Sequence, residues 1–303
     1  MLSFSPIEEL DRTLYRSHVK SCGFYFPSCE FAYANLFAWS GMYQTSFAAD
    51  ESGFYFLMHH DGEQYFLCPV TSPEQAGAAF DTLCSYMRGC GADKLNLICL
   101  PKVFADRLAE RFPGVSPSND RGNADYLYKT QSLATFSGKA LHAKKNHRNK
   151  FFSLYAESYE YRVMTAADAP LCRDFNRKWY SLNAEYIDEE FSAEHKATNR
   201  LLDNFEPLGL CGGMLFADGT LCAYTLASDN YDGSDTLIIH TEKGLYDIPG
   251  VYPTICSEFL LHSGADYEFV NREDDLNDEG LRKSKLSYNP IGFEEKYSAV
   301  VPL

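Results

Sequence analysis

The sequence lacks the features that mark secreted and membrane-embedded proteins. Its first residues, MLSFSPIEELDRTLY, have no basic start and no apolar stretch of the kind found in signal peptides. No apolar run approaches the roughly 20 residues that a membrane span needs. The 10 cysteines include no C-x-x-C pair, and Cys99 and Cys222 lie in apolar runs, where a reduced thiol packs as a small hydrophobic group. We therefore expect a cytoplasmic protein with reduced cysteines and no transmembrane segment.

Positive charge is also scarce. The chain has 27 Lys and Arg against 42 Asp and Glu, so its formal net charge is −15. Such a chain does not coat nucleic acid or anionic membranes non-specifically, and any contact of this kind requires a local basic patch.

Several catalytic motifs are missing. The sequence contains no G-x-G-x-x-G, P-loop, H-E-x-x-H or G-x-S-x-G, which leaves dinucleotide-binding, Walker-type, zincin and α/β-hydrolase functions without support. His59 and His60 are adjacent in a predicted strand and point to opposite faces, so we expect no metal site there. No cysteine has a sequence neighbour that would activate it as a nucleophile.

Hydrophobic periodicity predicts the same order of elements in both halves of the chain. Asp61-Gly62 and Asp218-Gly219 each separate two apolar runs, which is the strongest local signal of a β-hairpin. In the first half we expect helices at about 5–17 and 29–40, the hairpin 53–70, a helix over 73–87, a strand over 95–100, a helix over 101–112 and a strand over 126–136. In the second half we expect a strand over 159–164, helices around 171–179 and 197–205, the hairpin 212–226, a strand over 236–242, a helix over 253–262, a strand over 268–271, a helix over 278–288 and a strand over 293–300.

This repetition predicts a tandem α+β protein. The expected parts are an N-terminal domain over 1–136, a basic connecting helix over 137–155 and a C-terminal domain over 156–303. The order of elements, with mixed and mostly antiparallel sheets, resembles the Gcn5-related N-acetyltransferase fold, in which two central strands splay apart around the donor. This likeness concerns the fold and does not by itself give a function.

Residues 137–155 form a basic segment that contains no acidic residue. It holds two histidines and five cations, namely Lys139, Lys144, Lys145, Arg148 and Lys150. One interpretation is an anion site for a coenzyme A phosphate, a tRNA backbone or a lipid head group. The alternative is a solvated helix whose cations face acidic surface elsewhere, although like charges at Lys144 and Arg148 disfavour an isolated helix.

Two further stretches in the second half carry candidate chemistry. Arg282 and Lys285 lie on one face of a predicted helix and would repel each other unless an anion or carboxylate lay between them. The alternative is ordinary surface pairing of Asp278 with Arg282 and of Glu279 with Lys283. In the predicted strand TLIIHTEKG, side-chain alternation puts His240 and Glu242 on one face. One interpretation is that Glu242 binds a substrate ammonium or acts as a base. The alternative is that the two residues lie at an exposed strand end and have no chemical role.

Several motifs together resemble the DUF2156 family, the soluble C-terminal region of phosphatidylglycerol lysyltransferases. They are YANLFAW (33–39), ADYLY (124–128), the GK…KKNHRNKF run (138–151), EKG (242–244), VNREDD (270–275), GLRKSKLSYNP (280–290) and EKY (295–297). The resemblance implies a tandem acetyltransferase-like fold that transfers an aminoacyl group from aminoacyl-tRNA to an amine or hydroxyl acceptor.

The resemblance also implies roles for individual residues. Glu242, Arg282 and Lys285 are the expected catalytic residues, with Glu242 recognising the amine of the aminoacyl group and the two cations holding phosphate. The expected substrate-binding residues are Lys139, Lys144, Lys145, Asn146, Arg148, Asn271, Arg272, Glu273, Asp274 and Tyr288. No metal and no resident cofactor are expected.

The sequence departs from the family pattern in ways that keep other functions open. This sequence does not contain the membrane-spanning part of the lipid-modifying enzymes. The sequence therefore does not single out a lipid as the acceptor, and a small molecule, a peptide and a lipid all stay open. The stretch GLYDIPGVY (244–252) is degenerate as an acetyltransferase pyrophosphate loop. The alternatives are a transferase that uses acetyl-CoA or another acyl-CoA, and a non-catalytic anion-binding protein of the same fold. The sequence does not predict the oligomeric state.

Overall fold

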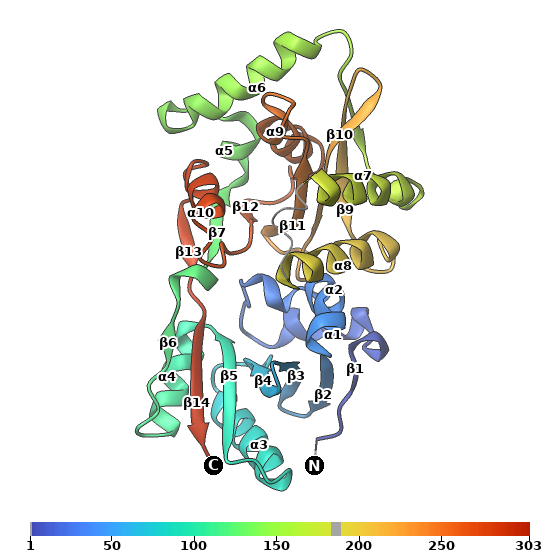
Figure 1. Cartoon of the computed structure of the whole chain (residues 1–303). Helices are drawn as coiled ribbons and strands as arrows, with labels where there is room; N and C mark the ends of the chain where they lie inside the picture. Colours follow the sequence, from blue (N-terminus) through green and yellow to red (C-terminus); the bar gives the residue numbers. More distant parts are fainter. Residues whose placement is uncertain (1, 183–188) are drawn as a thin grey trace. The chain divides into compact units, whose positions relative to one another are not determined.

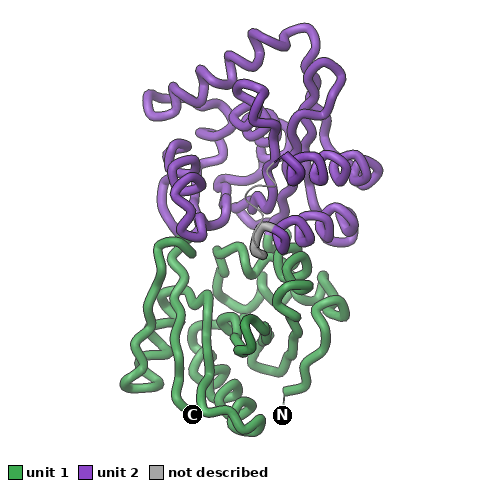
Figure 2. The backbone as a smooth tube through the Cα atoms, in the orientation of Figure 1, with its two compact units in different colours: residues 1–124, 230–232, 294–303 green, residues 125–229, 233–293 purple. Residues whose placement is uncertain are grey.

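The computed structural model describes residues 2–182 and 189–303, and the chain divides into two compact units. Unit 1 contains residues 1–124, 230–232 and 294–303, and unit 2 contains residues 125–229 and 233–293 (Figure 2). Each unit is built on one seven-stranded sheet (Figure 1). The chain is therefore a tandem of two α+β units with mixed sheets.

The sheet of unit 1 contains one parallel strand pair, β4 with β5, and is otherwise antiparallel. Its strand order is β1 (Ser5–Pro6), β2 (Ser46–Asp50), β3 (Gly53–His60), β4 (Glu63–Leu67), β5 (Lys94–Leu100), β14 (Tyr297–Pro302) and β6 (Ser118–Asn119). The α-helices of this unit are α1 (Arg12–Ser21), α2 (Tyr33–Tyr43), α3 (Ala76–Gly89) and α4 (Lys102–Arg111).

In the sheet of unit 2, β11 and β12 pair in parallel. Its strand order is β13 (Gly292–Glu294), β7 (Asp125–Lys129), β12 (Phe269–Asn271), β11 (Thr236–Gly244), β10 (Thr220–Ser228), β9 (Cys211–Ala217) and β8 (Glu160–Val163). The α-helices are α5 (Thr130–Thr135), α6 (His142–Tyr155), α7 (Ala169–Leu182), α8 (Glu189–Asp203), α9 (Val251–Ser263) and α10 (Glu279–Leu286). Helix α9 packs on the sheet, and α6 and α5 pack against α9.

The limits of the units differ from the limits expected from sequence. Residues 125–155, including the basic helix α6, group with unit 2 and do not connect two domains. The last strand, β14, returns to unit 1 and lies between β5 and β6. Periodicity along the chain cannot reveal this exchange, because strand pairing is decided by partners far apart in sequence.

Both predicted hairpins are present, with turns at the expected residues. Asp61 and Gly62 have φ of 48° and 76°, and Asp218 and Gly219 have φ of 50° and 72°. Two successive left-handed residues match the twist of the flanking strands, and Asp-Gly is among the pairs that adopt this conformation most readily.

Three expected elements are wrong in their limits. The first helix begins at Arg12 and not near residue 5, because the side chain of Asp11 caps it by accepting from the Leu14 N–H at 2.7 Å. The strand expected over 126–136 ends at Lys129 and continues as α5. The strand expected over 293–300 is two strands, β13 and β14, which belong to different sheets.

The candidate site lies where the parallel strands β11 and β12 stop pairing. The two strands pair only from Thr236 with Phe269 to Ile238 with Asn271. Strand β11 then continues to Gly244, whereas the chain after β12 turns away, with Glu273 in the left-handed region at φ 55°. The side chains at the end of β11 therefore face the loop that follows β12.

Candidate functional site

A buried ion pair joins the end of β11 to the loop after β12. Arg272 Nη2 lies 2.7 Å from Glu242 Oε1, and the two side chains are 12% and 6% exposed. Glu242 Oε2 and Arg272 Nη1 are buried and have no hydrogen-bond partner. Because buried polar atoms normally have partners, these two atoms mark the pair as a candidate ligand site.

Burial and charge act against each other within this pair. Burial raises the pKa of Glu242, while the positive charges of Arg272 and Lys144 oppose the rise. Burial also disfavours the charged form of Arg272, but the Glu242 carboxylate outweighs it and the pKa of Arg272 is raised. The attraction between the two opposite charges thus offsets the cost of burying them.

Two cations lie over the ring of Tyr288, which is 2% exposed. The guanidinium carbon of Arg272 lies 4.6 Å from the ring centre, and Lys144 Nζ lies 3.7 Å from it. Burial, followed by the charge of Arg272, lowers the pKa of Lys144 to about 8. Tyr288 therefore brings Lys144, from helix α6, next to the Glu242–Arg272 pair.

Arg282 contacts the loop after β12 and does not lie beside Lys285 on an open helix face. Its Nε and Nη2 donate to Asp275 at 2.9 and 2.7 Å. The Tyr126 hydroxyl donates to the same carboxylate at 2.5 Å, and Asp275 is fully buried. Burial opposes ionisation of Asp275, but these hydrogen bonds prevail and lower its pKa to about 2. The surface pairing of Arg282 with Asp278 is not observed, since Asp278 accepts from the Leu281 N–H as the cap of α10.

Lys285 is bound to the backbone of the same loop. Its Nζ donates to the Arg272 carbonyl oxygen at 2.7 Å and also to the Asp274 carbonyl oxygen. Burial lowers the pKa of Lys285, while Glu273 and Asp274 oppose the change. Lys285 therefore fixes the backbone that carries Arg272.

The remaining predicted residues of this loop also hold it in place. The Asn271 amide donates to Asp125 at 2.8 Å and accepts from the Glu273 N–H at 2.7 Å. Glu273 Oε1 lies 3.0 Å from His240 Nδ1, whose ring Nε2 lies 2.8 Å from the Ser228 hydroxyl. His240 and Glu242 thus project from one face of β11, and both meet the loop after β12.

The basic helix α6 has two different sides. Lys139, which precedes α6, and Lys145 and Asn146, within it, are exposed. Arg148 points inward, where its Nη1 donates to the Ser257 hydroxyl at 2.7 Å and to the Ala134 carbonyl oxygen at 3.3 Å. The structure therefore brings Lys144 to the Glu242–Arg272 pair, uses Arg148 to attach the helix, and leaves the other three at the surface.

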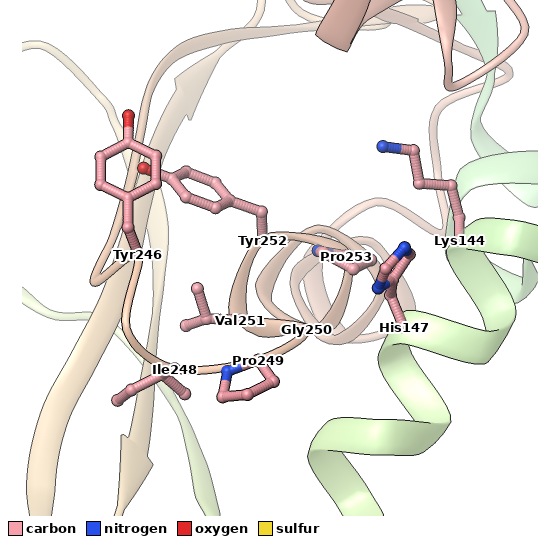
Figure 3. Close-up of a pocket in the computed structure, with 9 residues that line it drawn as sticks. All are labelled: Lys144, His147, Tyr246, Ile248, Pro249, Gly250, Val251, Tyr252 and Pro253. Carbon is pink, nitrogen blue, oxygen red and sulfur yellow. The ribbon is translucent and has the colours of Figure 1, made fainter.

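A pocket of about 170 Å³ lies where α6 meets the start of α9 (Figure 3). Its lining consists of Lys144, His147, Tyr246, Ile248, Pro249, Gly250, Val251, Tyr252 and Pro253. Lys144 and His147 come from α6, and the others come from the loop after β11 and the first turn of α9. The sequence of residues 244–252 indicates a degenerate pyrophosphate loop and does not point to Tyr246 or Tyr252 as ligand contacts. Two tyrosines in that stretch were the available signal.

Lys243 is a second residue that the sequence analysis did not single out. It lies on the other face of β11 from Glu242, with Nζ 2.7 Å from Glu194 and 3.9 Å from the ring centre of Trp179. Burial lowers the pKa of Lys243, and Glu194 opposes the change. The expected motif EKG thus contributes one charge to each face of the strand.

The two compact units, each with one mixed sheet, define a tandem α+β protein. The chain belongs to the family described as phosphatidylglycerol lysyltransferase, C-terminal, which matches residues 26–300. The resemblance noted from the sequence motifs is confirmed, and the family is named for an aminoacyl transfer.

Solved structures of other proteins are similar to most of the chain, among them the following two. A conserved protein of unknown function from Bacteroides thetaiotaomicron VPI-5482 is 30% identical, with coverage of 99% of this chain and 100% of the other and a TM-score of 0.90. The C-terminal domain (DUF2156) of a putative lysylphosphatidylglycerol synthetase from Agrobacterium fabrum is 14% identical, with coverage of 96% and 92% and a TM-score of 0.65. The second likeness supports the fold alone.

A curated relative is an uncharacterized protein from Mycoplasmoides gallisepticum. It is 22% identical over 179 residues, which are 58% of this chain and 55% of the relative. The chain thus matches about half the length of that protein. Within residues 2–182 and 189–303, no helix combines the length and the apolar character needed to cross a bilayer.

Proposed function

We propose that this chain transfers an aminoacyl group from an aminoacyl-tRNA to an amine or hydroxyl acceptor. The observation that carries the proposal is the buried Glu242–Arg272 pair, in which Oε2 and Nη1 each lack a partner. Family membership supports an aminoacyl transfer, and the cations around the pair suit an anionic donor. The acceptor is a small molecule, a peptide or a lipid.

An aminoacyl ester is already reactive, so the site needs to position it and to stabilise charge. The acceptor nitrogen or oxygen attacks the ester carbonyl carbon, and the bond from that carbon to the ribose oxygen breaks. Arg272 Nη1 is suited to donate to the carbonyl oxygen as negative charge develops on it. Glu242 Oε2 is suited to bind the ammonium of the aminoacyl group. The proton that the acceptor loses ends on the ribose oxygen.

The contacts of Arg282 and Lys285 favour a positioning role over direct phosphate binding. Arg282 holds Asp275, and Lys285 holds the carbonyl oxygens of Arg272 and Asp274. Both act through the loop that carries Arg272, so changes to them are expected to alter activity indirectly. Glu242 and Arg272 are the residues that we expect to touch the substrate.

The test is transfer of a radiolabelled amino acid from a mixture of aminoacyl-tRNAs to small-molecule, peptide and lipid acceptors. Loss of one charge-assisted contact in the transition state typically lowers the rate by about 10²–10³. We expect losses of that size for Glu242→Gln and Arg272→Lys, and almost none for Lys283→Ala on the exposed side of α10. Thermal melting of each variant separates loss of chemistry from loss of folding.

Other outcomes decide between the remaining functions. Transfer that requires acetyl-CoA and survives ribonuclease would replace the tRNA-dependent reaction with an acyl-CoA-dependent one. Saturable anion binding without turnover of any donor would indicate a non-catalytic binding protein. Full activity of folded Glu242→Gln and Arg272→Lys would move the active site elsewhere.

A further inference from the structure

The pocket at the start of α9 combines an aromatic wall with two side chains from the basic segment. Tyr246 and Tyr252 lie side by side, with ring centres 5.5 Å apart (Figure 3). Lys144 and His147, one turn apart on α6, line the same space. An aromatic surface beside a cation is the usual arrangement for binding a nucleobase together with its phosphate.

The aromatic wall is held in place from behind. The Tyr252 hydroxyl and the Trp179 indole N–H both donate to the Gly244 carbonyl oxygen, at 3.1 and 3.0 Å. The Trp179 ring lies 6.1 Å from that of Tyr246. Tyr246 itself is 70% exposed, which is high for a large aromatic side chain. A ring that is supported on one side and open on the other is suited to stacking.

The charge around the pocket favours a polyanion over a single small anion. Lys144 and His147 belong to the basic segment of residues 137–155, which has no acidic residue although the chain carries a net charge of −15. Lys145 and Lys150 of the same helix are exposed and extend the positive surface beyond the pocket. Helix α9 begins at the pocket, and its first turn contains no acidic side chain. Exposed Asp247, in the loop between the lining residues Tyr246 and Ile248, is the acidic residue of this stretch. Backbone N–H groups at the start of α9 add to the positive potential.

We propose that this pocket binds the single-stranded 3′ end of RNA, with one base stacked on Tyr246 and the adjoining phosphate between Lys144 and His147. The proposal rests on the proposed function, in which the donor is an aminoacyl-tRNA whose ester lies at such an end. Lys144 also contacts the ring of Tyr288, which packs against Arg272, so the pocket adjoins the Glu242–Arg272 pair. The pocket thereby places the terminal nucleotide next to the reacting ester.

The experiment measures fluorescence anisotropy of a 5′-fluorescein-labelled RNA tetranucleotide, ACCA, which carries no amino acid. Loss of one stacked base is expected to weaken binding about 5- to 100-fold, so Tyr246→Ala should raise the Kd by that factor. Tyr246→Phe keeps the ring and should bind like the unaltered protein. Tyr65→Ala removes a partly exposed tyrosine of β4, in unit 1, which is not among the pocket residues, so it is the control.

The electrostatic half of the proposal has its own readout. Loss of one phosphate contact on a single strand should reduce the slope of log K against log salt by about 0.7, which we expect for Lys144→Ala. Lys283→Ala, which alters an exposed cation of α10 outside both the basic segment and the pocket, controls for general charge. An unchanged Kd in Tyr246→Ala, or an unchanged slope in Lys144→Ala, would overturn the assignment.

Two results separate this proposal from the proposed function. Binding of the tetranucleotide that depends on Tyr246, without transfer from any aminoacyl-tRNA, would support the RNA site and contradict the reaction. Transfer at full rate and unchanged KM in Tyr246→Ala would support the reaction and contradict the RNA site. Tyr246-dependent binding of coenzyme A, with RNA binding that ignores Tyr246, would assign the pocket to an acyl-CoA instead.

Discussion

Lys144 shows how the surroundings of one residue decide its chemistry. Its ammonium lies over Tyr288, faces the guanidinium of Arg272 and is partly removed from water. Burial and Arg272 favour the neutral amine, whereas Glu242 and Cys256 favour the charged form, and the resulting pKa is about 8. Lys144 is therefore protonated at neutral pH, but loses its charge well below the pH at which a solvated lysine does.

This environment predicts a measurable titration. The reactivity of Lys144 toward isotopically labelled acetic anhydride, followed by peptide mass spectrometry between pH 6 and pH 10, should rise with a midpoint near pH 8. The neutral amine is the reactive form, so reactivity increases as the proton is lost. Glu242→Gln removes a negative charge that favours the ammonium and should shift the midpoint to lower pH. A midpoint above pH 10 would show that Lys144 is fully solvated.

Helix α6 passes close to Gly250, the residue that precedes α9. A Cβ atom at this position would lie 2.0 Å from the His147 carbonyl oxygen, and Gly250 has φ 81°. Only glycine satisfies both conditions without strain. Arg148 secures the same contact by donating to Ser257 on α9. The pocket therefore depends on a close helix contact that one glycine permits.

We expect Gly250→Ala to destabilise the protein more than a matched glycine variant does. Gly219, in the β9–β10 turn, has φ 72° but nothing within 4 Å of a Cβ atom, so Gly219→Ala tests backbone strain alone. That strain costs about 1–2 kcal/mol, and the steric conflict at Gly250 should add about 1–3 kcal/mol. Urea denaturation measures both free energies of unfolding. Equal effects of the two variants would show that α6 moves away from α9 at little cost.

On the scale of the whole molecule, the two halves of the chain exchange strands. Strand β14, from the end of the chain, pairs with β5 and β6 in unit 1. Strand β7, from the first half, pairs with β12 in unit 2, where its Tyr126 donates to Asp275. Neither sheet is complete without a strand from the other half of the sequence.

Removal of β14 is therefore expected to damage unit 1 selectively. A chain ending at residue 295 leaves β5 without its antiparallel partner and removes Val301, which is 1% exposed. Amide hydrogen exchange should show large losses of protection in β5, while β10 and β11 of unit 2 keep theirs. Unchanged protection of β5 would mean that unit 1 is stable without the exchanged strand.

The sequence by itself determined the local elements, and these follow from forces that act over a few residues. Asp-Gly pairs fix both hairpins, because their left-handed φ angles are favoured by the residues themselves. Strand alternation correctly placed His240 and Glu242 on one face. The family motifs likewise identified the stretches around Glu242 and Arg272, because each motif is a short run of neighbouring residues.

Tertiary structure alone decided which of these residues meet. Arg282 and Lys285 share a helix face in sequence, yet one contacts the Asp275 side chain and the other the loop backbone. Lys144 is one of five cations in its segment, and only packing of α6 on α9 distinguishes it from exposed Lys145. Strand exchange and the contact of Lys144 with the Tyr288 ring join residues more than 100 positions apart. Their energies depend on distance in space, which local sequence patterns do not contain.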